Sequence, residues 1–339
     1  MQKKLIALAI TAAFASAPAF ADTSVYGLVD GGYGSKATTN LGTNVKTTDS
    51  GIVFSQDQTT RFGVKSTEDL GNGMKAGFQV EMGLNADAGV AVDRVLAGSL
   101  DFGQGTALTI GKMSSPFRGI VYGNDAMYGA NFVGNLLTSA IDKSAVTSTG
   151  INQRVVAADV AHNFGAVKAS LGLINGTQKI DGQPDQQSGN GVELTGVYKQ
   201  DALSVSGGYR NQKTTTHGGA DTTDNMLVLA AGYDFGMAKL SAEYGSHDSK
   251  DNVAGTSDKY AMETVGVNMP FTSDLAGYVQ VSGGKHDLAG GGSNNLSAYG
   301  VGLHYDMSKH TFGYAHFGSQ KEDTVTKIDQ FGFGLVHSF

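Results

Sequence analysis

The sequence predicts an all-β fold, namely a 16-stranded antiparallel β-barrel that spans a membrane. Three observations support this prediction. Apolar and polar residues alternate with a period of two. Short and long connections follow one another in strict alternation along the chain. The composition is rich in glycine and poor in charged residues. The chain has 49 Gly among 339 residues and only 16 % charged residues, whereas soluble domains carry about 25 %. It has no Cys, so disulfide scaffolds and thiolate chemistry are excluded.

Residues 1–21 form a separate element, a predicted signal peptide. Two lysines give a positive start, residues 5–14 are apolar, and Ala-Phe-Ala at 19–21 supplies a small-x-small cleavage site. The alternative is a buried N-terminal helix. We expect export and a mature barrel domain of residues 22–339. Beyond residue 21 no apolar run approaches the roughly 18 residues that a membrane helix needs.

The predicted strands follow from the alternation. Apolar residues occupy every even position from Met74 to Leu84, and the odd positions between them hold Lys, Gly, Gln and Glu. Successive side chains of a strand point to opposite faces, so one face is apolar and the other polar. We count 16 such segments, most of about 9–13 residues, the length of a tilted strand that crosses a bilayer. Clear examples lie at 167–173, 203–210, 239–244, 297–306 and 331–339.

The connections predict the topology. Seven short and eight long connections alternate along the chain, which implies 16 strands. Tight turns at one end and longer loops at the other are typical of bacterial outer-membrane barrels, whose short turns face the periplasm. The short connections fall near 69–73, 102–105, 163–166, 200–202, 234–238, 269–274 and 307–310, and the long ones near 35–50, 87–91, 113–150, 176–190, 213–224, 248–258, 287–294 and 320–327.

Proline and lipid both constrain this interpretation. Proline is barred from central strands, and Pro116, Pro184 and Pro270 all fall in predicted connections. The alternative all-β folds, a soluble sandwich or a propeller, should carry a more charged outer face. Lipid offers no hydrogen bonds to an open sheet edge, so the strands must close into a ring. A ring of 16 strands encloses water, so its polar inner face predicts a hydrophilic channel.

The residues resemble the Gram-negative general-diffusion porins, in particular the trimeric β-proteobacterial and neisserial type, over the whole mature chain. The most specific match is the second-strand hairpin at 60–76. Lys112 stands where this family usually has Arg, and the sixth strand lacks its usual Tyr-Asp-Ser-Pro stretch. The other matching segments are the first strand, the fourth and fifth strands, and the ending in a terminal phenylalanine, at 24–32, 93–94, 102–112 and 334–339.

Residues 113–150 are long and apolar for a solvated connection. A connection of this length in a compact domain is normally functional or disordered. Ten large apolar residues between Phe117 and Leu137 need a wall to pack on. In porins the third loop folds into the barrel and narrows it, and the resemblance implies that role here. The alternative is an outward loop used in subunit contacts.

The scarce arginines are the candidate pore residues. Arg61 lies on the polar face of its strand because Phe62 occupies the other face, and similar reasoning places Arg94 in the lumen. In the sixth strand the alternation does not decide between Arg154 and Asp159. The resemblance places Arg154 inside, with the other two arginines on one wall of the constriction. The alternative is that each arginine is paired with a neighbouring acid and stabilises the wall.

The resemblance also implies acidic loop residues opposite this wall. Asp125 is the first candidate and Asp142 the second. Glu81 shares the inward face of its strand and would offset part of the positive charge. Lys112 and Arg118 flank the start of the loop and would add to it.

Partners follow from charge, surface and resemblance. A formal charge of −7 argues against nucleic acid. Small residues at apparently outward positions (Gly27, Gly31, Ala97 and Ser99) agree with the homotrimer that the family forms. Phe339 resembles the signal that the outer-membrane assembly machinery recognises, although it could be a simple girdle aromatic. A Gram-negative outer-membrane location implies contact with its lipid and lipopolysaccharide.

We therefore expect a water-filled channel for passive, size-limited diffusion of ions and small hydrophilic solutes. Its charge selectivity should be weak, and the residues leave the sign open. We expect no enzyme activity, cofactor or metal site. A turn separates His304 from His316, which argues against a metal site on one strand. No helix follows the glycines at 290–292, which argues against a phosphate-binding loop. The alternatives are a substrate-specific channel of the same architecture and a barrel enzyme, for which no acid/His or Ser/His cluster can be assembled.

Overall fold

The computed structural model describes residues 21–85, 89–127, 132–139, 154–178, 187–216 and 221–339. Apart from residue 21, the predicted signal peptide lies outside these ranges and stays a prediction. No helix within them is both long enough and apolar enough to cross a bilayer. The elements in chain order are β1 (Ala21–Asn40), β2 (Val45–Phe54), β3 (Arg61–Gly71), β4 (Met74–Asn85), β5 (Gly89–Asp101), β6 (Thr106–Met113), α2 (Pro116–Asn124), α3 (Leu136–Ser139), β7 (Val155–Phe164), β8 (Val167–Gln178), β9 (Gln187–Gln200), β10 (Leu203–Thr216), β11 (Asp221–Asp234), β12 (Lys239–Asp251), β13 (Ser257–Pro270), β14 (Leu275–Asp287), β15 (Ser293–Asp306), β16 (Thr311–Glu322) and β17 (Thr326–Ser338).

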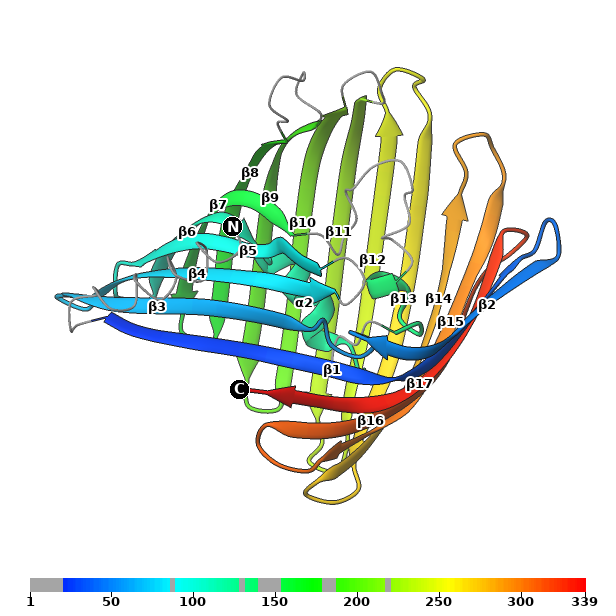
Figure 1. Ribbon diagram of the computed structural model, residues 1–339. Helices are drawn as coiled ribbons and strands as arrows, with labels where there is room; N and C mark the ends of the chain where they lie inside the picture. Colours follow the sequence, from blue (N-terminus) through cyan, green and yellow to red (C-terminus); the bar gives the residue numbers. More distant parts are fainter. Residues whose placement is uncertain (1–20, 86–88, 128–131, 140–153, 179–186, 217–220) are drawn as a thin grey trace, which may run out of the picture.

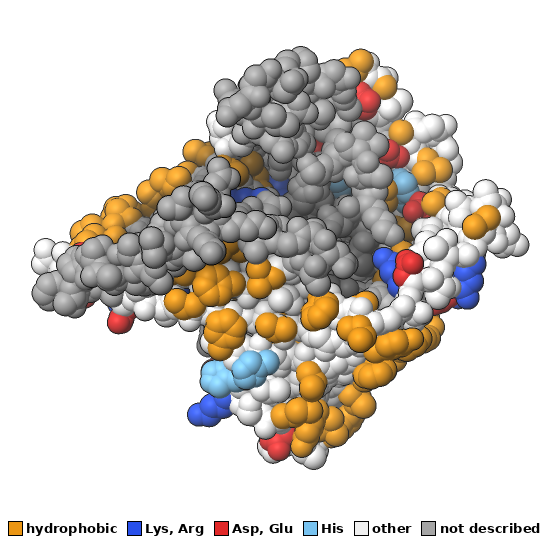
Figure 2. All heavy atoms as spheres, viewed as in Figure 1, with side chains coloured by type: hydrophobic (Ala, Val, Ile, Leu, Met, Phe, Trp, Pro, Cys, Tyr) orange, Lys and Arg blue, Asp and Glu red, His pale blue; other side chains and the backbone are white. Residues whose placement is uncertain are grey.

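The strands expose their apolar face outward. In β15, buried and exposed residues alternate without a break from Ser293 to Leu303, and the exposed positions include Tyr299 and Val301. Figure 2 shows hydrophobic side chains gathered on the outer surface of the strands. A soluble sandwich would bury such residues, whereas a lipid-facing wall requires them outside. The soluble alternative is therefore wrong.

The ring is closed and has 16 strands. Neighbouring strands pair in antiparallel fashion, and β1 pairs with β17 to complete the ring. On its other side β1 pairs first with β2, as far as Gly31↔Phe54, and then with β3, from Leu28↔Arg61. β2 and β3 are thus two parts of one wall strand. The 17 strand segments therefore make 16 barrel strands, the predicted number. Figure 1 shows how the strands are arranged around the lumen.

All 15 predicted connections coincide with observed ones, but at the loop end the strands run further than the alternation suggested. β16 and β17 are separated only by residues 323–325, within the connection predicted at 320–327. The reason is that ladder hydrogen bonds join main-chain groups. They continue beyond the apolar band into segments whose side chains are polar.

The third loop folds into the lumen, as predicted. α2 contacts β9 to β12, and α3 contacts β13 to β15; Figure 1 shows α2 within the ring. α2 begins after Ser115, whose Oγ accepts a hydrogen bond from the backbone N–H of Arg118 at 3.3 Å. Pro116 occupies the first turn, where its missing N–H has no cost.

The loop is held mainly by apolar packing. Its residues Phe117, Leu136 and Leu137 are fully buried, and they join Met226 and Val228 of the inner face of β11 in one cluster. Burial of a large apolar side chain contributes about 1.5–3 kcal/mol. Five such loop residues in this cluster therefore contribute about 10 kcal/mol before the cost of ordering the loop is subtracted.

Candidate pore constriction

Three charged residues meet on three neighbouring strands, namely Arg61 on β3, Glu81 on β4 and Arg94 on β5. The Nε of Arg94 donates to Oε1 of Glu81 at 2.5 Å, and the Nε of Arg61 lies 3.7 Å from Oε2 of the same carboxylate. The arginine side chains are 24 % and 15 % exposed, whereas that of Glu81 is 9 % exposed. One carboxylate shared by two guanidinium groups leaves a net positive charge that faces the lumen.

A β-bulge turns Arg94 inward. Pairing of β4 with β5 runs to Glu81↔Val95 and continues from Gly83↔Ala91, so one residue of β4 faces three residues of β5. Such a bulge re-aims side chains and breaks the alternation. As a result Arg94 and its neighbour Val95 both line the lumen. The bulge, and not simple parity, gives Arg94 this facing.

The shared carboxylate is also braced from β1. The hydroxyl of Tyr26 donates to Oε2 of Glu81 at 3.0 Å, and Nε2 of Gln79 donates to the same hydroxyl at 2.6 Å. Gly63 of β3 makes room for this ring, because a Cβ at that position would collide with it. These contacts fix Glu81 and, through it, the two arginines.

The arginines line a cavity of about 760 Å³ on the lumen side of β3 to β8. Five cations and two carboxylates of the described residues border it, which leaves an excess of three positive charges. Lys168 was not among the predicted pore residues, although it lies on the polar face of its strand. The charged lining residues are Arg61, Arg94, Arg118, Arg154, Lys168, Glu81 and Asp159.

The structure resolves the facing of Arg154 and Asp159. β7 begins at Val155, so Arg154 precedes the strand and is not bound by its alternation. Within β7, Asp159 is buried on the inward face, whereas Val160 is exposed. Both charged residues therefore line the same cavity. The alternation allowed only one of Arg154 and Asp159 to face inward because Arg154 was counted as part of the strand.

Arg118 and Lys112 differ in their placement. The Nη1 of Arg118 donates to Oγ of Ser114 at 3.0 Å, and its guanidinium lies 4.0 Å from the centre of the Tyr122 ring, a cation–π distance. Arg118 lines the cavity from the loop side. Lys112 shares the outward parity of Ile110, so it does not line the cavity. The prediction that Lys112 belongs to the constriction is therefore wrong, because Lys112 is on the outer face of β6.

Asp125 does not line the cavity that holds the arginines; it borders a separate one with Lys239. It is buried, and its Oδ1 accepts hydrogen bonds from the N–H of Met127 at 3.2 Å and from Nδ2 of Asn135 at 3.3 Å. Asn135 also donates to Oε2 of Glu243 on β12 at 3.1 Å. Asp125 therefore belongs to the contact between loop and wall. The second candidate, Asp142, lies outside the described residues.

Arg210 of β10 is a loop anchor that the sequence prediction did not assign. Its Nη2 and Nε donate to Oε2 of Glu193 on β9 at 2.7 and 3.0 Å, and its Nη2 also donates to Oγ of Ser115 at 2.8 Å. The other oxygen of Glu193 accepts from the backbone N–H of Phe117 at 2.8 Å. A wall carboxylate at a helix N-terminus favours that helix. The available signal was the place of Arg210 on the polar face of its strand.

The described residues hold no group of three His, Asp or Glu side chains arranged to bind a metal. His304 instead contacts Asp306 on its own strand, with Nε2 3.0 Å from Oδ1, and His316 contacts Asp57 at 2.6 Å. These histidines take part in separate pairs.

A sequence profile of the Gram-negative porins matches residues 6–325. The chain belongs to this family. The porin is 26 % identical to an outer membrane porin protein of Bordetella pertussis over the full length of both chains. Its fold is similar to that of an anion-selective porin from Comamonas acidovorans, with a TM-score of 0.76 and 22 % identity over 94 % of this chain and all of the other. It is also similar to a trimer form of OmpT from Vibrio cholerae, with a TM-score of 0.67 and 14 % identity over the same shares.

Family membership defines the location and the broad activity. The porin is a β-barrel of the Gram-negative outer membrane and forms a diffusion channel there. Its family and relatives are channels rather than enzymes.

Proposed function

We propose that this porin is a general-diffusion channel for ions and small hydrophilic solutes, with a weak preference for anions. The observation that supports the preference is the charge of the cavity beside the third loop, where five cations face two carboxylates. The predicted counter-acid Asp125 does not line this cavity. The fold likeness to an anion-selective porin points in the same direction.

The size of the effect follows from Coulomb's law. An anion 10 Å from one uncompensated charge gains about 0.4 kcal/mol in water and about 1.7 kcal/mol at an effective dielectric constant of 20. Salt screens this further, because the Debye length is about 8 Å at physiological ionic strength. Such energies bias permeation several-fold and exclude neither ion. The proposed channel therefore discriminates mainly by size.

Planar-bilayer recording in a KCl gradient tests the proposal. Wild-type porin should give discrete conductance steps and a reversal potential on the anion-selective side. Arg61→Ser and Arg94→Ser should each shift the reversal potential toward cations. Lys309→Ser, in the exposed turn 307–310, is the control and should leave it unchanged. A cation-selective wild type, or arginine variants that match the control, would contradict the proposed preference.

We propose further that the porin forms a homotrimer through an outer face made by β1, β2, β16 and β17. A hollow there has a glycine floor and an apolar rim, with Ile52 82 % exposed. The small residues predicted on the outer face of β5 do not belong to this surface. Ala97 lines the lumen, and Ser99 has the same parity, so the prediction that both point outward is wrong. Leu96 is the residue of β5 that is exposed on the outer face. Ile52→Arg should convert the native oligomer to monomers, measured by light scattering in detergent.

The chain end supports a proposed role in assembly. Phe339 follows β17, is 57 % exposed and exchanges two backbone hydrogen bonds with Gly27 at 3.0 and 3.1 Å. Gly27 leaves space for the Phe339 ring, because a Cβ there would collide with it. We propose that this accessible terminal aromatic is recognised by the outer-membrane assembly machinery.

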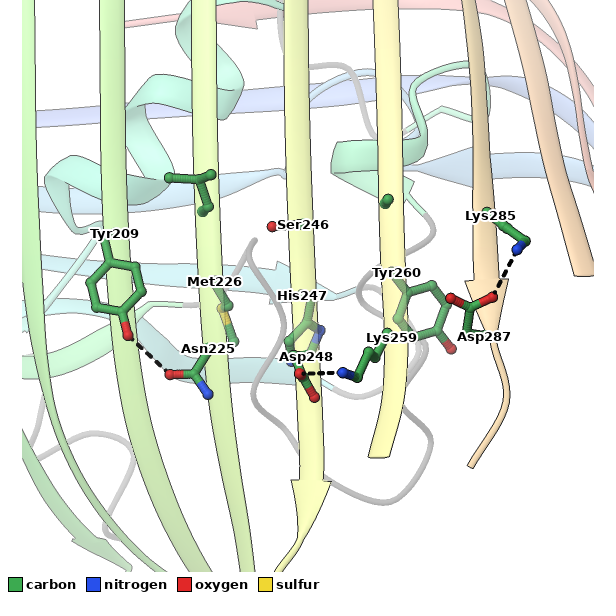
Figure 3. Close-up of a pocket in the computed structure, with 12 residues that line it drawn as sticks. Tyr209, Asn225, Met226, Ser246, His247, Asp248, Lys259, Tyr260, Lys285 and Asp287 are labelled. Carbon is green, nitrogen blue, oxygen red and sulfur yellow. Dashed lines mark hydrogen bonds and ion pairs between the residues drawn. The ribbon is translucent and has the colours of Figure 1, made fainter. Parts of the chain in front are cut away.

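Contact with lipopolysaccharide is proposed at the loop end of β10 to β14. Figure 3 shows Lys259 of β13 beside Asp248 of the adjacent β12, and Lys285 beside Asp287 on β14. Each ammonium lies 3.2 Å from its carboxylate, and the lysine side chains are 57 % and 58 % exposed. Lysines bind phosphate, and carboxylates can share divalent cations with it. This patch therefore suits the phosphorylated head group of an outer-leaflet lipid.

A further inference from the structure

A short part of the second wall strand, residues 55–60, leaves the plane of the barrel. Pairing with β1 ends at Gly31↔Phe54 and resumes at Leu28↔Arg61. Two residues of β1 therefore face six residues of the other strand. The ladder has no place for the four surplus residues, so they bend out of the sheet. We call residues 55–60 the inward segment, because they fold to the lumen side.

A buried carboxylate of β1 fixes the inward segment. Asp30 is fully buried, and its Oδ2 accepts hydrogen bonds from the backbone N–H groups of Asp57 at 2.6 Å and Gln58 at 2.9 Å. Its Oδ1 accepts from the hydroxyl of Tyr314 at 2.8 Å. The backbone N–H of Asp30 donates to Oγ1 of Thr60 at 3.0 Å. These bonds define one conformation for the segment.

Two glycines receive the first part of the segment. The side chain of Gln56 is buried over Gly34 of β1 and Gly332 of β17, where a Cβ at either position would collide with it. The wall thus has a hollow shaped for this side chain. The inward course of the segment is thus built into the two successive strands on one side of it, β1 and β17.

His316 of β16 connects the inward segment with the third loop. Its Nε2 lies 2.6 Å from Oδ1 of Asp57, and its ring centre lies 5.1 Å from that of Phe132 in the loop. The segment and the loop enter the lumen from different parts of the wall. They meet at this imidazole, so the narrowing of the channel is shared between them.

The inward segment separates two cavities of opposite character. The first is the cavity of about 760 Å³ with the arginines. The second, of about 460 Å³, lies toward the turns 271–274 and 307–310. Three carboxylates and two histidines border it, namely Asp57, Asp274, Asp306, His304 and His316. Gln58 lines both cavities. A solute that passes from the basic cavity to the acidic one moves past this side chain.

We propose that the inward segment is a second selectivity element of the channel and that Gln58 is its specificity-determining residue. This inference rests on the proposed diffusion function. The third loop narrows the lumen from one side and displays Arg118 to the solute, whereas the inward segment divides the basic part of the path from the acidic part. A charge placed at Gln58 acts on every permeating ion, because it stands at the junction.

Full-length porin in planar bilayers with a KCl gradient provides the test. Gln58→Lys should raise the chloride-to-potassium permeability ratio and Gln58→Glu should lower it, each by roughly two- to threefold, as one charge near a hydrated path does. The matched controls are Gln104→Lys and Gln104→Glu in the exposed turn 102–105, which should leave the ratio at the wild-type value. Removal of residues 56–59 keeps the alternation in phase and should raise the single-channel conductance.

The outcomes separate the two proposals. If wild-type porin conducts and the Gln58 variants match the Gln104 variants, the inference is overturned and the diffusion function stands. If the ratio moves in opposite directions for Lys and Glu at Gln58 alone, the inference is supported, whether or not the deletion variant folds. If wild-type porin inserts into bilayers without any conductance, the proposed function fails and the inference fails with it.

Discussion

Glu193→Gln should loosen the third loop and leave the barrel wall intact. The Glu193 and Arg210 side chains are 2 % and 1 % exposed, and the carboxylate also accepts a hydrogen bond from the amide of Phe117 at 2.8 Å. Glutamine keeps the shape but leaves the guanidinium without a counter-charge. Loss of one partner of a buried ion pair costs about 3–5 kcal/mol. The apolar contacts of the loop contribute about 10 kcal/mol before ordering costs, so this loss is a large share of the net docking free energy.

Single-channel recording and limited proteolysis of the native porin measure this effect. The variant should show more open-state noise and faster cleavage between β6 and β7, while the thermal transition of the β-sheet signal stays near that of wild type. The control combines Glu193→Leu with Arg210→Met. This double variant leaves no unpaired charge, so its open-state noise should be lower than that of Glu193→Leu alone or of Arg210→Met alone. Wild-type noise and protection in Glu193→Gln, or a double variant noisier than both singles, would refute the anchoring argument.

Three further predictions concern other parts of the porin. Arg154→Ser should shift the reversal potential toward cations and change the thermal midpoint little, because Arg154 lies among like charges in the cavity; bilayer recording and thermal melts measure both. Gly27→Val should displace the Phe339 ring and lower the folded fraction, scored by heat-modifiable migration on a gel. Lys259→Ala with Lys285→Ala should weaken binding to lipopolysaccharide vesicles in flotation and leave conductance unchanged.

Strand parity predicted the facing of Arg61 and Glu81 correctly, but it failed for Ala97 and Ser99 because their apolar and polar neighbours do not alternate clearly. Arg61 and Glu81 were placed in the lumen because facing on an undisturbed strand depends only on odd and even positions. The same rule places Lys112 with Ile110 on the outer face, and its nearness to the loop in the sequence was misleading. Closeness along the chain is not closeness across the lumen.

The remaining features depend on pairing and packing, which a single sequence does not show. The bulge that turns Arg94 inward is a mismatch between β4 and β5, so it can be seen only when both strands are paired. The inward segment 55–60 has the same origin, a mismatch between β1 and the second wall strand. Asp125 was predicted at the aperture from its type and place in the loop, but its facing is set by Asn135 and Glu243.

The inner wall has two chemically different halves, and this explains both the position of the loop and the location of the water. Met226, Val228, Met262 and Leu296 point inward from β11, β13 and β15, where a water-filled tube should have polar residues; all are buried. They form one cluster with α2 and α3, so the apolar half specifies where the loop lies. The opposite half, β3 to β8, has the charged residues that stay hydrated. Apolar residues at inward positions of a wide barrel therefore indicate the part of the lumen from which water is excluded, and the charges opposite them indicate the path of the solute.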